Sequence, residues 1–578
     1  MLKRNAYHLF LFLPFCFLLS CSLSPSKTIV VSPEDSLLAV LNEMQSGDTL
    51  LLHGGTYREG LEVATNGIII QAFPGEKVVL SGTEEINNWI KVKDNLYKAF
   101  CKKEVLQLFH KGKMLMPARW PNIDSMFDKK GWLPLYTKKN TTVFKGHSWP
   151  AHYWDNAFCF SNAGQKWVVN IETVKCNSDG LLNMSEPWFN YTSGNYTGDG
   201  EGYIIKHLNA LDTMNEWHWQ NDTVYAMLPE DPSQSGGVEG QTKKIMLSGK
   251  ELCDVRVKNI SVFGGRIEFS DSKDILLDNV DVAYGTPIQS YEYSNGGTYA
   301  AVIFNGEAEH CCLFNSVVKG NWGGAVFLAG EGNEVYNCEI SDCNWMGNGS
   351  AAVTTEGADH VVMNCTLYNS GKFLIGHSRT ENITIKYNHL YNGGYLTNDM
   401  GLTYAYCTDG DGSEIAYNWV HDNKATNAGV GIYIDMDGHD FLIHHNTVWN
   451  CQNGIQTIMD AYDHQLYNNT IWNCGKAINY WGVMGTNMYN QRVYNNLANG
   501  IFDAGSDIQF NLCVGESQFV DEAKHDFRLR KDSKAIDYGA FLEGITTYYT
   551  GAKPDAGAYE YGMDPVVPGY DSTCVYAD

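Results

Sequence analysis

The chain has little charge, little of it is positive, and long apolar runs are rare. Only 19% of the 578 residues are charged, and 66 acidic residues against 41 Lys and Arg give a formal net charge of −25. Nucleic acids select basic surfaces, so this balance argues against nucleic-acid binding and, more weakly, against polyanionic substrates. Beyond the N-terminus no run approaches the roughly 20 apolar residues of a membrane-spanning helix.

The one compact apolar run lies at the N-terminus. Lys3 and Arg4 precede Ala6–Leu19, which is typical of a signal peptide. The following Leu-Ser-Cys resembles a bacterial lipobox, so residues 1–21 are predicted as a lipoprotein signal peptide with Cys21 as the lipidated residue. An ordinary signal peptide is the alternative. We expect an exported bacterial lipoprotein on the outer membrane or cell surface, or on the periplasmic face, which contacts membrane only through this anchor.

The chain is rich in repeats. Between about residues 301 and 496, short apolar strands and polar turns recur, and each ends near an Asn at intervals of 22 to 30 residues. These residues are Asn315, Asn337, Asn364, Asn388, Asn418, Asn446 and Asn469. Repeats of this length with β-branched strands and Asn turns indicate a solenoid. The sequence therefore predicts an all-β protein built as a right-handed parallel β-helix, whose long surface suits a polymer.

The repeat is interrupted once. Residues 26–88 are predicted to form an N-terminal cap and the first coils, with helical apolar spacing in Pro33–Gln45. From 89 to 247 the period is lost, and strand-like runs with several Trp predict an inserted β-rich domain. The rungs then resume, so 248–562 is predicted as the main β-helix and 563–578 as a C-terminal tail.

The cysteines also follow the repeat. Cys338 and Cys365 each follow a rung Asn, and Cys451 and Cys474 each end a Trp-Asn-Cys run. Equivalent positions on neighbouring rungs lie about 4.8 Å apart. That spacing allows disulfides or a ladder of buried thiols, of which the ladder is favoured. No Cys/His spacing fits zinc, so no metal site and no required cofactor are predicted, with structural calcium as an alternative.

Two segments outside the repeat carry a family resemblance. The run QLFHKGKMLMPARWPN (107–122), the LD-x-x-x-EW segment (211–217) and the flanking coils resemble Bacteroidetes-type β-helical glycoside hydrolases. These are the β-xylosidase and α-L-fucosidase/xylanase types (families 120 and 141). The resemblance covers most of the mature chain. It implies an exported enzyme that cleaves glycosidic bonds in a plant or algal polysaccharide, or in an oligosaccharide derived from it, with paired carboxylates.

Strand alternation assigns side chains to the two faces of the coil. The strands were aligned on a small residue followed by an apolar one. Residues predicted to point inward are Val353, Leu402, Tyr404, Ile432, Ile434 and Ile455. Residues predicted to point outward are Glu356, Thr403, Tyr433, Asp435, Gln456, Asn479 and Trp481. Polar and aromatic residues thus gather on the outer face, which predicts a saccharide groove there.

Asp435 is the first candidate catalytic residue. Asp437 follows two residues later and would face the same side if the strand continued. Two close carboxylates raise the pKa of one of them, which gives the acid and the ionised group of glycoside hydrolysis. The resemblance implies Asp399 as the partner instead, with Asp437 in reserve. Turn capping or a calcium ladder would also explain the aspartates that recur nine residues before a rung Asn.

Further residues are candidates for binding the sugar. They are Tyr433, Glu356, Gln456, Trp481, His377, Arg379 and His421. A polysaccharide lyase is the second hypothesis, with Arg379, His377 and Lys386 as base and cation; the acidic outer face counts against it. A non-catalytic glycan-binding solenoid is the third hypothesis.

Overall fold

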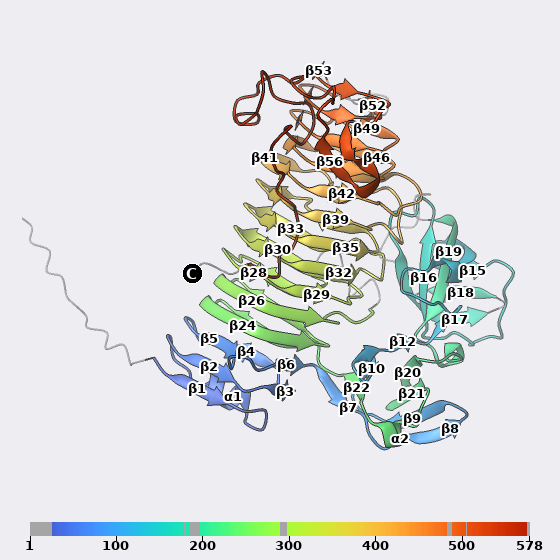
Figure 1. Ribbon diagram of the computed structural model, residues 1–578. Coiled ribbons are helices and arrows are strands. Elements are labelled where there is room, and N and C mark those ends of the chain that lie inside the picture. Colours follow the sequence, from blue (N-terminus) through green and yellow to red (C-terminus); the bar gives the residue numbers. More distant parts are fainter. Residues whose placement is uncertain are drawn as a thin grey trace, which may run out of the picture.

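The computed structural model describes residues 26–178, 180–184, 197–289, 298–482, 488–503 and 506–574. The predicted signal peptide and Cys21 lie outside these residues. Apart from 3-10 turns, the helices here are α1 (Leu37–Leu41) and α2 (Pro232–Ser235), and the other regular elements are strands. Most strands stack in parallel into one long coil (Figure 1), which confirms the predicted all-β parallel β-helix. Within the described ranges, no helix has the length and apolar character needed to cross a bilayer.

Three parallel sheets form the walls of the coil. One sheet runs from β1 (Thr28–Val31) to β53 (Asp507–Gln509), and another runs from β3 (Gly55–Tyr57) to β54 (Leu512–Cys513). The remaining sheet is called the site sheet below. It contains β4 (Leu61–Val63), β23 (Ile245–Lys250), β25 (Arg266–Ser270), β27 (Ala300–Asn305), β30 (Gly324–Glu331), β33 (Ala351–Ala358), β36 (Phe373–Gly376), β40 (Met400–Ala405), β43 (Gly429–Ile434), β46 (Asn453–Ile458), β49 (Lys476–Trp481) and β52 (Ile501–Asp503).

The core of the coil is a stack of like residues. Ile432, Ile455 and Ile478 pair in register on successive rungs and are fully buried. Each therefore removes its apolar surface from water against the same residue type above and below, which stabilises the rungs. The predicted inward positions are confirmed for Val353, Leu402, Ile432, Ile434 and Ile455, all of which belong to this core.

The prediction is wrong for two residues of β40. Thr403 pairs with the core residue Ile432 and is fully buried, whereas Tyr404 pairs with Tyr433 on the outer face. Leu402 also belongs to the core, so two consecutive side chains face inward. This break in alternation reverses the face of the residues that follow it.

A second stack lines one turn of the coil. Asn418 and Asn446 donate their backbone N–H groups to the side-chain oxygens of Asn446 and Asn469, at 3.1 and 3.0 Å. In earlier rungs this position is held by Cys338 and Cys365, and the Asn before each has a positive φ. The Asn series read from the sequence therefore combines two adjacent columns. All 14 described cysteines are free thiols.

Asn446→Ala should destabilise the coil by about 2–5 kcal/mol, since buried polar groups left without partners cost about 1–3 kcal/mol each. The Asn446 side chain accepts from Asn418 and donates to the carbonyl of Ile415 at 2.7 Å. Urea unfolding would measure the change. The control Asn427→Ala, at an exposed loop residue, should lose less than about 0.5 kcal/mol. Equal losses would contradict a stabilising ladder.

The inserted domain occupies the interval in which the period is lost. Its sheets begin with β7 (Thr83–Glu85), a few residues before the boundary predicted at 89, and end with β22 (Val238–Gln241). Six strands close into a ring: β14 (Leu133–Lys138), β15 (Thr141–Phe144), β16 (Phe158–Ala163), β17 (Asn170–Ser178), β18 (Leu181–Met184) and β19 (Gly198–Ile205). This ring lies beside the middle rungs of the coil (Figure 1).

The last part of the chain runs back along the coil. After the hairpin of β55 (Phe519–Asp521) and β56 (Asp526–Leu529), residues 554–574, called the C-terminal strap below, follow the turns toward earlier rungs. Trp419 donates to the Tyr559 hydroxyl at 2.7 Å, and the Asn315 side chain donates to the carbonyl of Cys574 at 2.9 Å. The C-terminal end therefore lies near β28 (Cys312–Phe314) (Figure 1).

Candidate active site

Two aspartates meet across the outer face of the site sheet. Asp399 directly precedes β40, and Asp435 directly follows β43 on the next rung. Tyr404 and Tyr433, which pair in register, connect them: the Tyr404 hydroxyl donates to Asp435 Oδ2 at 2.6 Å and the Tyr433 hydroxyl to Asp399 Oδ1 at 3.2 Å. The chain thus places both carboxylates around one pair of tyrosines.

A lysine completes this cluster. Lys372 precedes β36, and only 6% of it is exposed. Burial lowers the pKa of Lys372 to about 8, although the negative charges of Asp399 and Asp435 act in the opposite direction. Its ammonium also lies 4.4 Å from the centroid of the Phe373 ring. The site therefore holds one cation close enough to two acids for their charges to act on it.

The two carboxyl groups have different surroundings. Burial raises the pKa of both. For Asp399 the charge of Asp435 raises the pKa further, and Tyr433, Lys372 and Trp167 oppose the rise. Asp435 is stabilised in its ionised form by Tyr404 and by the backbone N–H of Met436 at 2.7 Å. The charge of Asp435 thus disfavours ionisation of Asp399, whereas the two hydrogen bonds favour ionisation of Asp435.

Asp437 does not lie with this pair. Strand β43 ends at Ile434, and Asp437 is an exposed turn residue with a φ of 57°. The condition for its predicted position, a strand that continues beyond Asp435, is not met. Asp460, which like Asp437 lies nine residues before a rung Asn, also has a positive φ, and this agrees with the turn interpretation of these aspartates.

Three other predicted residues are not brought to the pair. His377 lies inside the coil, fully buried, and neither ring nitrogen has a hydrogen-bond partner; its neighbour Gly376 pairs with the outward Tyr404, so the next side chain faces inward. Arg379 is an exposed turn residue. His421 belongs to β42 (Trp419–His421) in another sheet, where it stacks on Trp449 at 4.0 Å between ring centroids.

The remaining predicted residues lie on the site sheet. Tyr433 and Gln456 pair in register, and Gln456 accepts a hydrogen bond from Asn479 at 2.7 Å. Trp481 ends β49 with half of its surface exposed, and Glu356 lies near the end of β33, three strands before β43. Polar and aromatic groups therefore extend along the sheet from the carboxylate pair.

Sequence reasoning missed three members of the site. Lys372 lies outside the aligned strands, and Trp167 belongs to the inserted domain. Tyr404 was assigned to the wrong face, although an alignment of its segment on the tyrosines of β40 and β43 would have shown the correct one. Among the described residues, no group of three or more His, Cys, Asp or Glu side chains is arranged to hold a metal.

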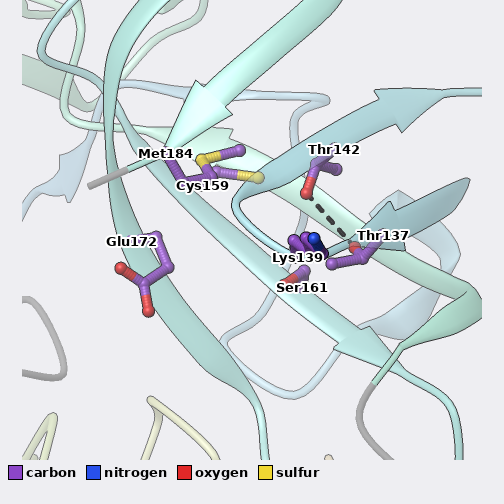
Figure 2. A pocket seen from close by; sticks show the side chains of 7 residues that line it. All are labelled: Thr137, Lys139, Thr142, Cys159, Ser161, Glu172 and Met184. Atoms are coloured by element: carbon purple, nitrogen blue, oxygen red, sulfur yellow. Dashed lines mark hydrogen bonds between the residues drawn. The ribbon is translucent and has the colours of Figure 1, made fainter. Parts of the chain in front are cut away.

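A separate cavity lies inside the inserted domain (Figure 2). It measures about 10 Å³ and is lined by Thr137, Lys139, Thr142, Cys159, Ser161, Glu172 and Met184. Such a volume holds about one water molecule. The cavity therefore has no room for a sugar.

Comparisons with known proteins agree with this architecture. The family described as "Right handed beta helix region" matches residues 274–448. A solved structure described as "Glycoside hydrolase" has a TM-score of 0.61 at 13% identity and covers 75% of this chain and 95% of its own.

Two further solved structures are less similar. Pectate lyase Pel9A has a TM-score of 0.36 at 13% identity, covering 93% of this chain and 98% of its own. A complex of XylC with xylose has a TM-score of 0.33 at 13% identity, covering 81% of this chain and 75% of its own. A search of curated proteins gave no match. The family match and the first structure show the fold, and on that evidence the chain is a right-handed parallel β-helix protein.

Proposed function

We propose that the chain is a glycoside hydrolase in which Asp399 acts as the general acid and Asp435 as the nucleophile or base. The observation that carries this proposal is the meeting of two carboxyl groups, each raised in pKa by burial, on the outer face of the coil. Glycoside hydrolysis needs one protonated and one ionised carboxyl group at the scissile bond.

The surroundings of the pair support this division of roles. Asp435 accepts two short hydrogen bonds, at 2.6 and 2.7 Å, which favour its ionised form. The resulting charge raises the pKa of Asp399 further, which is the direction that a general acid needs. A protonated Asp399 can then donate to the leaving oxygen, while Asp435 attacks the sugar or activates a water.

The wider surface also supports a carbohydrate substrate. Tyr404, which is partly exposed, and Trp481, which is half exposed, present aromatic rings along one sheet of a long coil, a shape that suits a polymer. The similarity to a solved glycoside hydrolase agrees with this assignment. We propose a plant or algal polysaccharide, or an oligosaccharide from it, as substrate for an exported, lipid-anchored protein.

Lys372 favours a second candidate function, a polysaccharide lyase. A lyase removes a proton next to a uronate carboxylate, and a lysine whose pKa is about 8 can serve as its base. Two aspartates beside Lys372 would repel the uronate. The hydrolase is therefore the better supported of the two functions.

Lys372→Met separates the two functions. For a hydrolase, loss of the cation raises the pKa of both aspartates, so both limbs of the pH profile should move upward by about one unit or more. Activity would be followed on a panel of plant and algal glycans with protein starting at Ser22, through new reducing ends and the ultraviolet absorbance of an unsaturated uronate.

The matched control is Lys372→Arg, which keeps the charge. In a hydrolase the arginine variant should retain a nearly unchanged pH profile, and no ultraviolet absorbance should appear with any variant. Ultraviolet-absorbing product from the wild type, abolished in both variants, would establish the lyase and contradict the carboxylate mechanism.

A further inference from the structure

The inserted domain reaches the carboxylate pair through one connection. Residues 164–169, between β16 and β17, lie against the loop that leads into Asp399. The backbone N–H of Asn398 donates to the carbonyl of Lys166 at 2.9 Å, and the Asn162 side chain donates to the carbonyl of Leu396 at 2.7 Å. These bonds join the two domains within a few residues of Asp399.

The contact is close-packed. Val169 and Leu396 are both fully buried in one apolar cluster that combines residues of the inserted domain and the coil. The backbone N–H of Val169 donates to the carbonyl of Gly347 at 2.9 Å. A Cβ at Gly347 would lie 2.6 Å from the Val169 side chain, and the φ of Gly347 is +64°, so only glycine fits this approach. The two domains therefore meet in a fixed interface.

Trp167 lies in the middle of this connection. The neighbouring Lys166–Asn398 bond brings it next to Asp399, and its side chain, whose one donor is the indole N–H, lowers the pKa of the Asp399 carboxyl group as a hydrogen-bond donor. The other side-chain partner of this carboxyl is the Tyr433 hydroxyl, from the coil. Asp399 is thus held between a donor of the coil and a donor of the inserted domain, 232 residues away in the sequence.

We propose that Trp167 is a positioning residue, and that the inserted domain completes the active site by orienting the carboxyl group of Asp399 through it. The role of Asp399 as general acid rests on the proposed function; the hydrogen bond does not. An acid that protonates a leaving oxygen must present its proton in one direction. Donors fixed on both sides of the carboxyl group define that direction.

The bond can be tested without a substrate. In protein labelled with ¹⁵N at the indole nitrogens of its 15 Trp residues, Trp167→Phe identifies the Trp167 signal by its loss. We expect this signal to shift with pH as Asp399 titrates, and to stop shifting in Asp399→Asn. Trp219→Phe is the matched control, because it removes another indole bond of the inserted domain, to the carbonyl of Cys101 at 2.9 Å. It should leave the titrating signal in place.

Kinetics test the positioning role. Trp167→Phe keeps an aromatic ring but removes a bond that favours ionised Asp399, so the basic limb of the pH profile should move upward. We expect kcat to fall about tenfold, the effect of one hydrogen bond to a charged group, with KM changed less than about threefold. Trp219→Phe should leave the pH profile unchanged.

Two results would overturn the inference. One is a Trp167 signal that does not titrate, or that titrates equally in Asp399→Asn. The other is a Trp167→Phe variant with wild-type kcat and pH profile. Absence of hydrolase activity in the wild type would instead contradict the proposed function, and the two failures are distinguishable because the spectroscopic test needs no substrate.

Discussion

Asp435→Asn should lower kcat/KM by about 10³-fold or more, the scale of a lost acid, base or nucleophile. Asparagine has nearly the shape of aspartate and can still accept the bonds from Tyr404 and Met436, but it carries no charge. The loss would therefore report chemistry. Because burial raises the pKa of Asp435, its charge costs stability in the folded protein, and the variant should be at least as stable as the wild type to heat.

The matched comparison is Asp437→Asn. Asp437 is the same residue type, two positions later, in an exposed turn. We expect its kcat/KM to stay within about threefold of wild type, as for most surface changes. A large loss in Asp437→Asn, or more than a tenth of wild-type activity in Asp435→Asn, would contradict the assignment. Melting temperatures would show that both variants are folded.

The second large effect expected is unfolding in mild acid. Burial lowers the pKa of six histidines to about 3 or 4: His218, His377, His389, His421, His445 and His464. In the unfolded chain they titrate near 6.5. As the pH falls below about 6.5, the unfolded chain therefore binds protons that the folded protein does not. Their stabilising contribution is complete above that pH and is lost toward pH 4.

Acids whose pKa is raised by burial, among them Asp399 and Asp435, act in the opposite direction, and the largest shifts are those of two glutamates. Burial raises the pKa of Glu216 and Glu560 to about 7, so the folded protein binds these protons first and gains stability as the pH falls. The six histidines outnumber these two glutamates by four, so unfolding takes up about four more protons at the histidines than it releases at the glutamates. At about 1.4 kcal/mol per proton and pH unit, four protons set an upper bound of about 5.6 kcal/mol per unit on the net loss. This is large against the roughly 5–15 kcal/mol of a typical folded domain.

Urea unfolding at a series of pH values from 7.5 to 4.5 would measure this loss. The variant His377→Leu tests whether buried histidines cause this pH dependence. His377 has no hydrogen-bond partner to lose, and its removal should reduce the slope of unfolding free energy against pH by the equivalent of about one proton. The variant should gain more stability at pH 5 than at pH 7.5. A flat dependence between pH 7 and 5 would contradict the prediction.

The sequence predicted the coil because one short pattern recurs in every rung and each copy reinforces the others. It failed at Tyr404, because Leu402 and Thr403 both face inward and no period-two pattern records such a break. It also failed at His377, whose polar side chain lies in the core against the usual preference. Asp399 and Asp435 could be named from their segments, but whether they catalyse a reaction remains a prediction.

Lys372 and Trp167 could not be found from the sequence. Lys372 is a single lysine between a turn and a short strand, and nothing in its neighbours distinguishes it. Trp167 is one of several tryptophans in a domain without a repeat, and its position beside Asp399 depends on how that domain packs on the coil. One sequence contains no signal for such a long-range contact.

The C-terminal strap makes its contacts with rungs that lie far apart along the coil. Rungs stack on their immediate neighbours, so a growing coil needs only local contacts. The side chain of Asn315 bonds the carbonyl of Cys574, 259 residues later, and the side chain of Asn337 bonds the carbonyl of Asp571, 234 residues later. Its contacts run from Thr470, whose hydroxyl accepts from the backbone N–H of Ala558 at 2.8 Å, back to Asn315, so all of them can form only when the rungs between these two residues are in place. The strap thus forms its full set of contacts only on a coil whose rungs are in register, and a missing or slipped rung between these contacts would leave part of the closure unmade.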